Sequence, residues 1–132
     1  MTYRLLRIGS WRCHFFFAKY GYEEEDILDL LYDLDAPDDI LVSASRKMRA
    51  GRKNEGFTYS NQMTHDAVIV IGPTTSGAEF QDTLVHEVHH LAVAIASSLG
   101  IDLESESPAY ISGDSARALA DVICKMGCPH CH

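Results

Sequence analysis

The chain has 132 residues, 46% hydrophobic and 23% charged, with a formal net charge of −8 at pH 7. This length suits one domain, residues 1–132, whose core needs neither disulfides nor metals. The acidic balance argues against a general nucleic-acid-binding protein, because phosphate contacts need a basic surface. No stretch reaches the roughly 18 apolar residues of a membrane span, and Arg12, Cys13 and His14 interrupt the N-terminal apolar residues, unlike a signal peptide. We therefore expect a cytoplasmic protein with reduced thiols and no nucleic-acid or membrane partner.

The first stretch of the chain predicts two β-strands. Residues 3–8 (YRLLRI) and 11–18 (WRCHFFFA) are rich in aromatic and β-branched side chains, which suit a half-buried, pleated surface. Gly9 and Ser10 lie between them, and we interpret this pair as the connecting turn. The three consecutive phenylalanines at 15–17 are interpreted as core packing, with a binding platform as the alternative.

Two amphipathic helices are predicted next. Residues 23–35 (EEEDILDLLYDLD) place acids in a first turn, where they favour the helix dipole, ahead of apolar residues at helical spacing. A second helix begins at Pro37 and ends near Gly51. Its basic end carries five of the eleven Lys and Arg residues: Arg46, Lys47, Arg49, Arg52 and Lys53. We interpret them as a solvated face that complements the dipole, with a phosphate-binding patch as the alternative.

A short buried strand follows the loop at 51–56. The run from Ala67 to Ile71 (AVIVI) is continuous, largely β-branched and bounded by Gly72-Pro73, which is typical of a buried strand. His65 is interpreted as a loop residue before this strand. The connection at 72–75 leads directly into the next helix.

The segment from Ser76 to Gly100 predicts one long helix with a signal at each end. Ser76 and Glu79 form an S-x-x-E capping box, and Gly100 suits a residue that leaves a helix with positive φ. Its apolar residues repeat at three- and four-residue intervals and define a core-facing stripe: Phe80, Leu84, Val88, Leu91, Ile95 and Leu99.

Beside that stripe the helix carries the pattern HExxH. His86 and His90 are one turn apart on one face, so both imidazoles can bind one metal ion. Glu87 lies about 100° further round the helix, where it could take a proton from a metal-activated water without being a ligand. The alternative is that these are ordinary polar residues on a helix flank, because so short a pattern also arises by chance.

A catalytic zinc usually has three protein ligands and an open position for water. Three carboxylates follow the helix within sixteen residues of His90: Asp102, Glu104 and Glu106. A second helix is predicted from Pro108, and a tight reversal would return its start toward the metal. Glu106 is our choice for the third ligand because Ser107-Pro108 restricts its direction, whereas the other two lie in the turn. Tyr110, if it faces the cleft, could donate a hydrogen bond to an oxyanion.

HEVHH followed by ESPAY resembles the zincin metallopeptidases, specifically small phage- or mobile-element-type peptidases with the gluzincin arrangement HExxH…E. The matching residues are His86, Glu87, His90, Glu106 and Tyr110. The resemblance spans residues 67–123. It implies an α+β, minimal zincin-like domain in which a small twisted sheet packs on the HExxH helix and the helix after it. It also implies that the strand at 67–71 belongs to that sheet, whose edge strand receives an extended peptide or protein substrate.

We therefore expect a zinc metallopeptidase in which His86, His90 and Glu106 hold Zn²⁺ and Glu87 is the general base. The alternative is a non-catalytic, metal-stabilised structural or interaction module of phage or mobile-element type. A di-iron site would need a second ExxH, and a metzincin would need HExxHxxGxxH; neither pattern is present. His89 is interpreted as exposed or as a neighbour of the ligands.

The C-terminal tail, residues 124–132, is rich in Cys and His. We interpret it as an exposed, reduced tail. The alternative is a second, structural zinc bound by Cys124, Cys128, Cys131 and either His130 or His132. A thioredoxin-like redox motif is disfavoured because C-P-H-C here follows a helix instead of beginning one.

Overall fold

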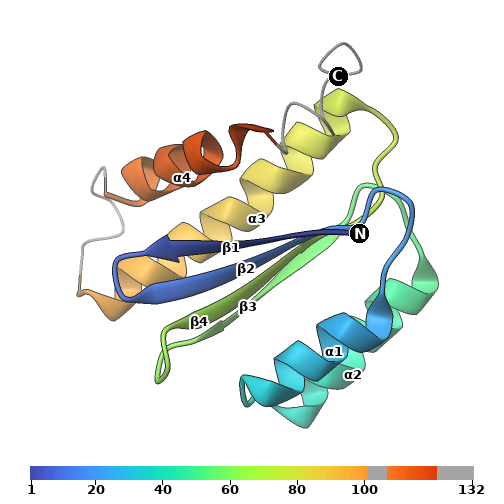
Figure 1. Ribbon diagram of the computed structural model, residues 1–132, viewed down its shortest axis with the longest axis horizontal. Helices are drawn as coiled ribbons and strands as arrows, with labels where there is room; N and C mark the ends of the chain where they lie inside the picture. The colour runs from blue at the N-terminus through green and yellow to red at the C-terminus, as the bar shows by residue number, and fades with distance from the viewer. Residues whose placement is uncertain (101–106, 122–132) are drawn as a thin grey trace.

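A computed structural model describes residues 1–100 and 107–121. Within these ranges helices and strands are mixed along the chain (Figure 1). The elements in chain order are β1 (Thr2–Ile8), β2 (Trp11–Phe17), α1 (Glu24–Asp33), α2 (Asp38–Ala50), β3 (Gly56–Asn61), β4 (Asp66–Ile71), α3 (Gly77–Ser98) and α4 (Ser107–Ala118).

The four strands form one sheet in the order β1-β2-β4-β3. β1 and β2 pair antiparallel as the predicted hairpin, with Ile8 opposite Trp11 and Gly9 in a left-handed conformation at φ 56°. β2 and β4 pair parallel, and β3 pairs antiparallel with β4. The predicted strand at 67–71 therefore belongs to the sheet, as expected, and lies inside it.

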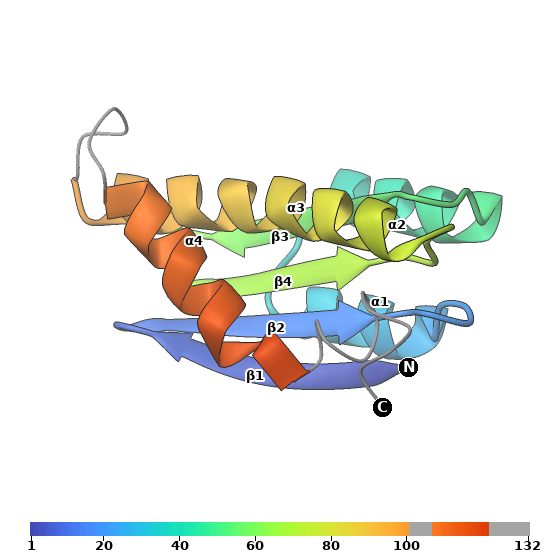
Figure 2. The same ribbon diagram turned by 90° about the horizontal axis from the view of Figure 1, so that it is seen from above.

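Helices cover both faces of the sheet, so the fold has three layers (Figures 1 and 2). Side chains of a strand alternate between the two faces, and β2 and β4 follow this rule. Phe15, Phe17 and Ile69 pack with α3 in one core, while Phe16 and Val70 pack with α1 and α2 in the other. The sequence correctly predicted a sheet packed on the HExxH helix and did not predict that the two early helices close the opposite face.

β3 is the strand that the sequence did not predict. Residues 56–61 (GFTYSN) combine Phe, Thr and Tyr, which favour strands, with Gly and Asn at the two ends, which do not. All six residues are half-buried, so no clear alternation of buried and exposed positions marks the segment. β3 forms because β4 beside it offers a row of backbone partners, from Gly56 opposite Ile71 to Asn61 opposite Asp66.

α3 has the ends that its sequence predicts. The Ser76 hydroxyl accepts a hydrogen bond from the Glu79 backbone N–H at 3.1 Å, and Gly100 has φ 68°. Most of the predicted apolar stripe is buried, from Phe80 to Ile95, but Leu99 is 57% exposed. The prediction that Leu99 belongs to the buried stripe was wrong, because the helix ends at Ser98 and the chain turns away from the core there.

The helix predicted after Pro108 is present as α4 and packs beside α3 (Figure 2). Leu119, just after it, is buried in the core that α3 shares with the sheet. Arg4 of β1 and Asp121 form an ion pair at 2.8 Å, which links this end of the chain to the outer strand. No helix among residues 1–100 and 107–121 combines the length and the apolar character needed to cross a membrane.

Candidate metal centre

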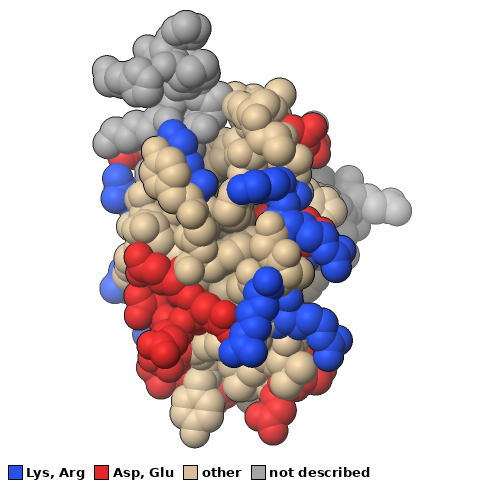
Figure 3. All heavy atoms as spheres, turned by 90° about the vertical axis from the view of Figure 1, so that its right-hand side faces the viewer, with Lys and Arg blue, Asp and Glu red and all other residues tan. Residues whose placement is uncertain are grey.

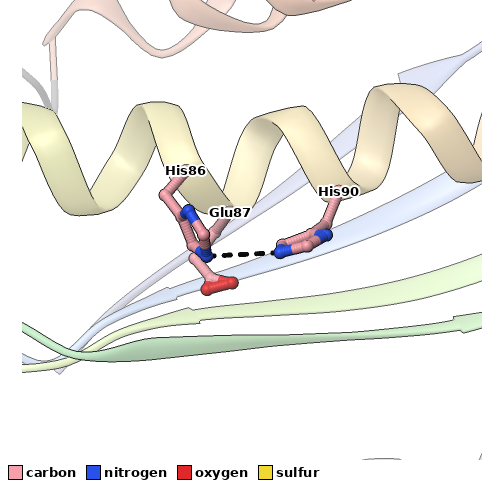
Figure 4. Close-up of side chains that lie close together, drawn as sticks. All are labelled: His86, Glu87 and His90. Carbon is pink, nitrogen blue, oxygen red and sulfur yellow. Dashed lines mark hydrogen bonds between the residues drawn. The ribbon is translucent and has the colours of Figure 1, made fainter.

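His86 and His90 point the same way from α3, toward β3 (Figure 4). Their Nε2 atoms lie 3.2 Å apart, and their rings are nearly perpendicular at 87°. Two imidazoles bound to one tetrahedral zinc at their usual bond lengths would have nitrogens about 3.3 Å apart. Both side chains are exposed. The spacing on the helix therefore produces the geometry that two ligands of one ion require.

Glu87 lies beside the two histidines but is buried, with 4% of its surface exposed. Its carboxylate sits between α3 and β3 (Figure 4). The Thr58 hydroxyl on β3 is 3.4 Å from Glu87 Oε1 and 3.3 Å from the Glu87 backbone oxygen. One donor atom from each of His86, Glu87 and His90 lies within 4.8 Å of the others, so this group could hold a metal ion.

Gly56 allows β3 to pass close to Glu87. A Cβ at this position would lie 2.5 Å from the Val70 backbone oxygen and 3.0 Å from Glu87 Cγ. Both distances are too short for a side chain to fit without displacing the strand or Glu87. The Lys47 ammonium of α2 donates to the Gly56 carbonyl oxygen at 2.8 Å and holds this point of β3 from the other side.

A polar cavity of about 280 Å³ adjoins the three residues. Its walls come from α2, the loop before β3, and the first half of α3; they comprise Lys47, Asn54, Glu55, Gly56, Asp82, Thr83, His86 and Glu87. Asn54, at φ 62°, accepts a hydrogen bond from the Thr75 backbone N–H at 2.9 Å, which ties the loop to the start of α3. A larger hollow between α1 and α2 is more apolar; among the described residues, the group that could hold a metal ion, His86, Glu87 and His90, lies at the polar cavity instead.

The sequence identified His86, Glu87 and His90, and the structure brings them together. Sequence reasoning missed Gly56, Thr58 and Lys47, because their role depends on which strand and helix lie opposite Glu87. A glycine just before an aromatic residue was the only local signal, and it is typical of many loops.

The other predicted residues have different outcomes. Glu106 and the tail at 124–132 lie outside the described residues, as does the side chain of Tyr110, whose backbone lies in the first turn of α4. His89 is exposed, as expected, and its ring centroid is 6.2 Å from that of His90. His65 lies in the turn before β4, as expected, where its ring stacks on Trp11 at 5.0 Å between centroids.

No family model, curated protein or solved structure matches this chain. The candidate metal centre is therefore identified by the positions of His86, Glu87 and His90 alone. Two imidazoles and a carboxylate form a donor set that suits zinc and related divalent transition metals. The chain carries a candidate metal centre of the HExxH pattern on a helix beside a sheet.

Proposed function

We propose that the protein is a zinc-dependent hydrolase, and specifically a metallopeptidase, in which His86, His90 and Glu106 hold the metal. The observation that carries this proposal is the 3.2 Å separation of the two Nε2 atoms next to the Glu87 carboxylate. A third protein ligand is needed for a catalytic zinc, and Glu106 takes this place by its sequence position and by the resemblance to HExxH…E peptidases.

The side chains have distinct roles in this proposal. A bound zinc would lower the pKa of its water to about 7 and polarise the scissile carbonyl. Glu87 accepts the proton of the attacking water and later delivers it to the leaving amine. The Thr58 hydroxyl beside Oε1 orients the carboxylate for this transfer. Tyr110 is proposed to donate a hydrogen bond to the developing oxyanion.

The substrate proposed is an extended peptide or protein segment that aligns with β3. β3 is an edge strand of the sheet, and its residues Gly56 and Thr58 border Glu87. An exposed strand edge can pair with an added peptide strand through backbone hydrogen bonds. A peptide placed there would pass the metal-binding face of α3.

Metal analysis tests the site directly. Purified protein should contain about one zinc per chain from a three-ligand site, and His86→Ala and His90→Ala should each remove it. His89→Ala is the matched control, because it removes an exposed imidazole from the same helix. Full zinc occupancy in the first two variants would exclude this site and direct attention to the C-terminal cysteines. The measurement is elemental analysis by mass spectrometry after dialysis.

Catalysis is tested by a peptide-library digest, which also identifies the substrate. Glu87→Gln should retain zinc and lose cleavage of every peptide that the wild type cuts, because the amide cannot act as a base. Turnover equal to that of the wild type would eliminate Glu87 as the base.

The burial of Glu87 favours one alternative, a non-catalytic module in which Glu87 is itself the third ligand. The exposed fraction of only 4% restricts the access of Glu87 to a metal-bound water, and its carboxylate lies close enough to the two imidazoles to share one metal ion with them. In that case Glu87→Gln would lose zinc together with the histidine variants, and no peptide would be cleaved. The same variant therefore separates an enzyme from a structural metal site.

A further inference from the structure

A hollow with an apolar floor lies between α1 and α2, on the face of the sheet opposite α3. Its volume is about 660 Å³, and its lining is Leu28, Asp29, Tyr32, Leu41, Val42, Ser45, Arg46 and Arg49. Two large apolar side chains in this lining are open to solvent: Tyr32 is 72% and Val42 is 55% exposed. We call this hollow and its two flanking helices the α1–α2 groove.

The two sides of the α1–α2 groove carry opposite charge. α1 has acids from its first turn to its end and no basic residue, whereas the second half of α2 has Arg46, Lys47 and Arg49 and no acid. Acidic and basic groups lie side by side in the lower part of Figure 3. Arg49 pairs with Glu24 within the chain at 3.0 Å. Asp29 and Arg46, which line opposite sides, form no ion pair with any residue in the described part of the chain.

We propose that the α1–α2 groove binds a second copy of this chain. A two-fold interface joins the same patch on both copies, so the patch must complement itself. A two-fold axis along the groove places α1 of each copy over α2 of the other, so that Asp29 faces the Arg46 side and Tyr32 and Val42 are covered. An axis across the helices would instead stack the acidic α1 on its own copy. Charge therefore selects the first arrangement.

The size of the groove sets the strength of this association. A 13-residue helix is about 20 Å long, and two helices side by side are about 20 Å wide, which gives a face of roughly 400 Å². A standard interface buries about 800 Å² per partner. The dimer is therefore weak and reversible, and salt weakens it further by screening the charged rims. The candidate metal centre faces β3 and stays outside this interface, so the inference does not rest on the proposed function.

Paired charge reversals test the arrangement. Asp29→Lys and Arg46→Glu each place like charges opposite one another at two symmetric positions, and each should lower the association constant by about tenfold or more. An equal mixture of the two variants restores an attractive pair at both positions and should associate like the wild type. Arg7→Glu on β1 is the control, because it reverses an exposed charge on a residue that does not line the α1–α2 groove.

The measurement is sedimentation velocity at low salt over protein concentrations up to about 1 mM, with circular dichroism to confirm that each variant is folded. We expect concentration-dependent dimers for the wild type, Arg7→Glu and the mixture, and monomers for each reversal alone. A wild type that stays monomeric throughout would overturn the proposal. So would single variants that associate like the wild type, or a mixture that fails to recover.

Discussion

Glu87 is the residue that joins the chemistry of the site to the packing of the fold. Its neighbours on the helix are the two exposed histidines, but its carboxylate is enclosed by β3. Thr58 approaches one carboxylate oxygen, and the missing side chain of Gly56 makes room for the rest of Glu87. In its proposed role as general base, Glu87 must keep one orientation to be effective. The contacts with β3 supply that constraint.

Gly56→Ala should therefore disturb both stability and the site. The added Cβ would meet the Val70 backbone oxygen at 2.5 Å, and overpacking of this kind costs about 1–3 kcal/mol. The strand or Glu87 must move, so we also expect reduced peptide cleavage. Urea denaturation and the peptide digest measure the two effects.

Gly113→Ala in α4 is the matched control for this substitution. A Cβ at Gly113 would meet no atom within 4 Å. Because alanine is the better helix former, the control should gain roughly 0.5–1 kcal/mol. Equal stability of Gly56→Ala and the wild type would mean that Gly56 does not approach Val70 and Glu87 this closely.

At the scale of elements, α3 carries the candidate metal ligands on one side and packs against α4 on another. His86 and His90 face β3, whereas Val85 and Val88 line a hollow on another side of α3 together with Ser112, Ala116 and Leu119. With about 100° per residue, these two sides are roughly 150° apart around the helix. α4 therefore packs on α3 on the side opposite His86 and His90, and the proposed third ligand, Glu106, belongs to the connection between the two helices.

That connection carries the prediction about the third ligand. Glu106→Ala should raise the zinc dissociation constant by more than about 100-fold, because losing a ligand weakens binding more than the 10- to 100-fold typical of a neighbouring residue. Asp102→Ala and Glu104→Ala are the matched controls and should have small effects. Competition with a chelating dye measures all three. A larger effect at either control would place the ligand in the turn, and small effects at all three would favour Glu87 as the third ligand.

At the scale of the whole molecule, contacts between distant parts of the chain tie the strands of the sheet to one another. Arg12 on β2 reaches Asp66 on β4 with two hydrogen-bonded contacts, at 2.9 and 3.0 Å, and Asp66 is buried. His14 on β2 bonds through Nδ1 to the Tyr3 hydroxyl on β1 at 2.7 Å. These contacts place titratable groups inside the sheet, so stability depends on pH.

His14 makes the protein less stable in mild acid. Burial lowers the pKa of His14 below its ordinary value of 6.5, although the nearby Asp66 opposes this shift. The unfolded chain then binds a proton more readily than the folded one, so the free energy of unfolding falls as the pH drops through 6.5 toward the folded pKa. His14→Gln cannot titrate and should show a shallower decline between pH 7 and pH 5. Urea denaturation of chelator-treated protein at each pH measures the slopes, and parallel slopes would contradict this role.

Much of this architecture is determined by local sequence. The hairpin around Gly9, the first two helices and the capped helix α3 depend on periodicity, turn residues and end signals that act within a few residues. His86, Glu87 and His90 could be found for the same reason, because residues one turn apart on a helix share a face whatever surrounds them. The buried character of β4 is equally visible in its continuous apolar run.

Only the tertiary structure decided what lies opposite these elements. β3 is only six residues long with Gly and Asn at its ends, and its place as a strand follows from its pairing with β4. The same pairing brings Gly56 and Thr58 to Glu87, a residue about thirty positions away in the sequence. The parallel alignment of β2 with β4 leaves both faces of the sheet to be covered, and α1 and α2 cover the second. Such contacts join residues that are distant in sequence, and no local pattern specifies which distant partner a backbone edge or an apolar face will meet.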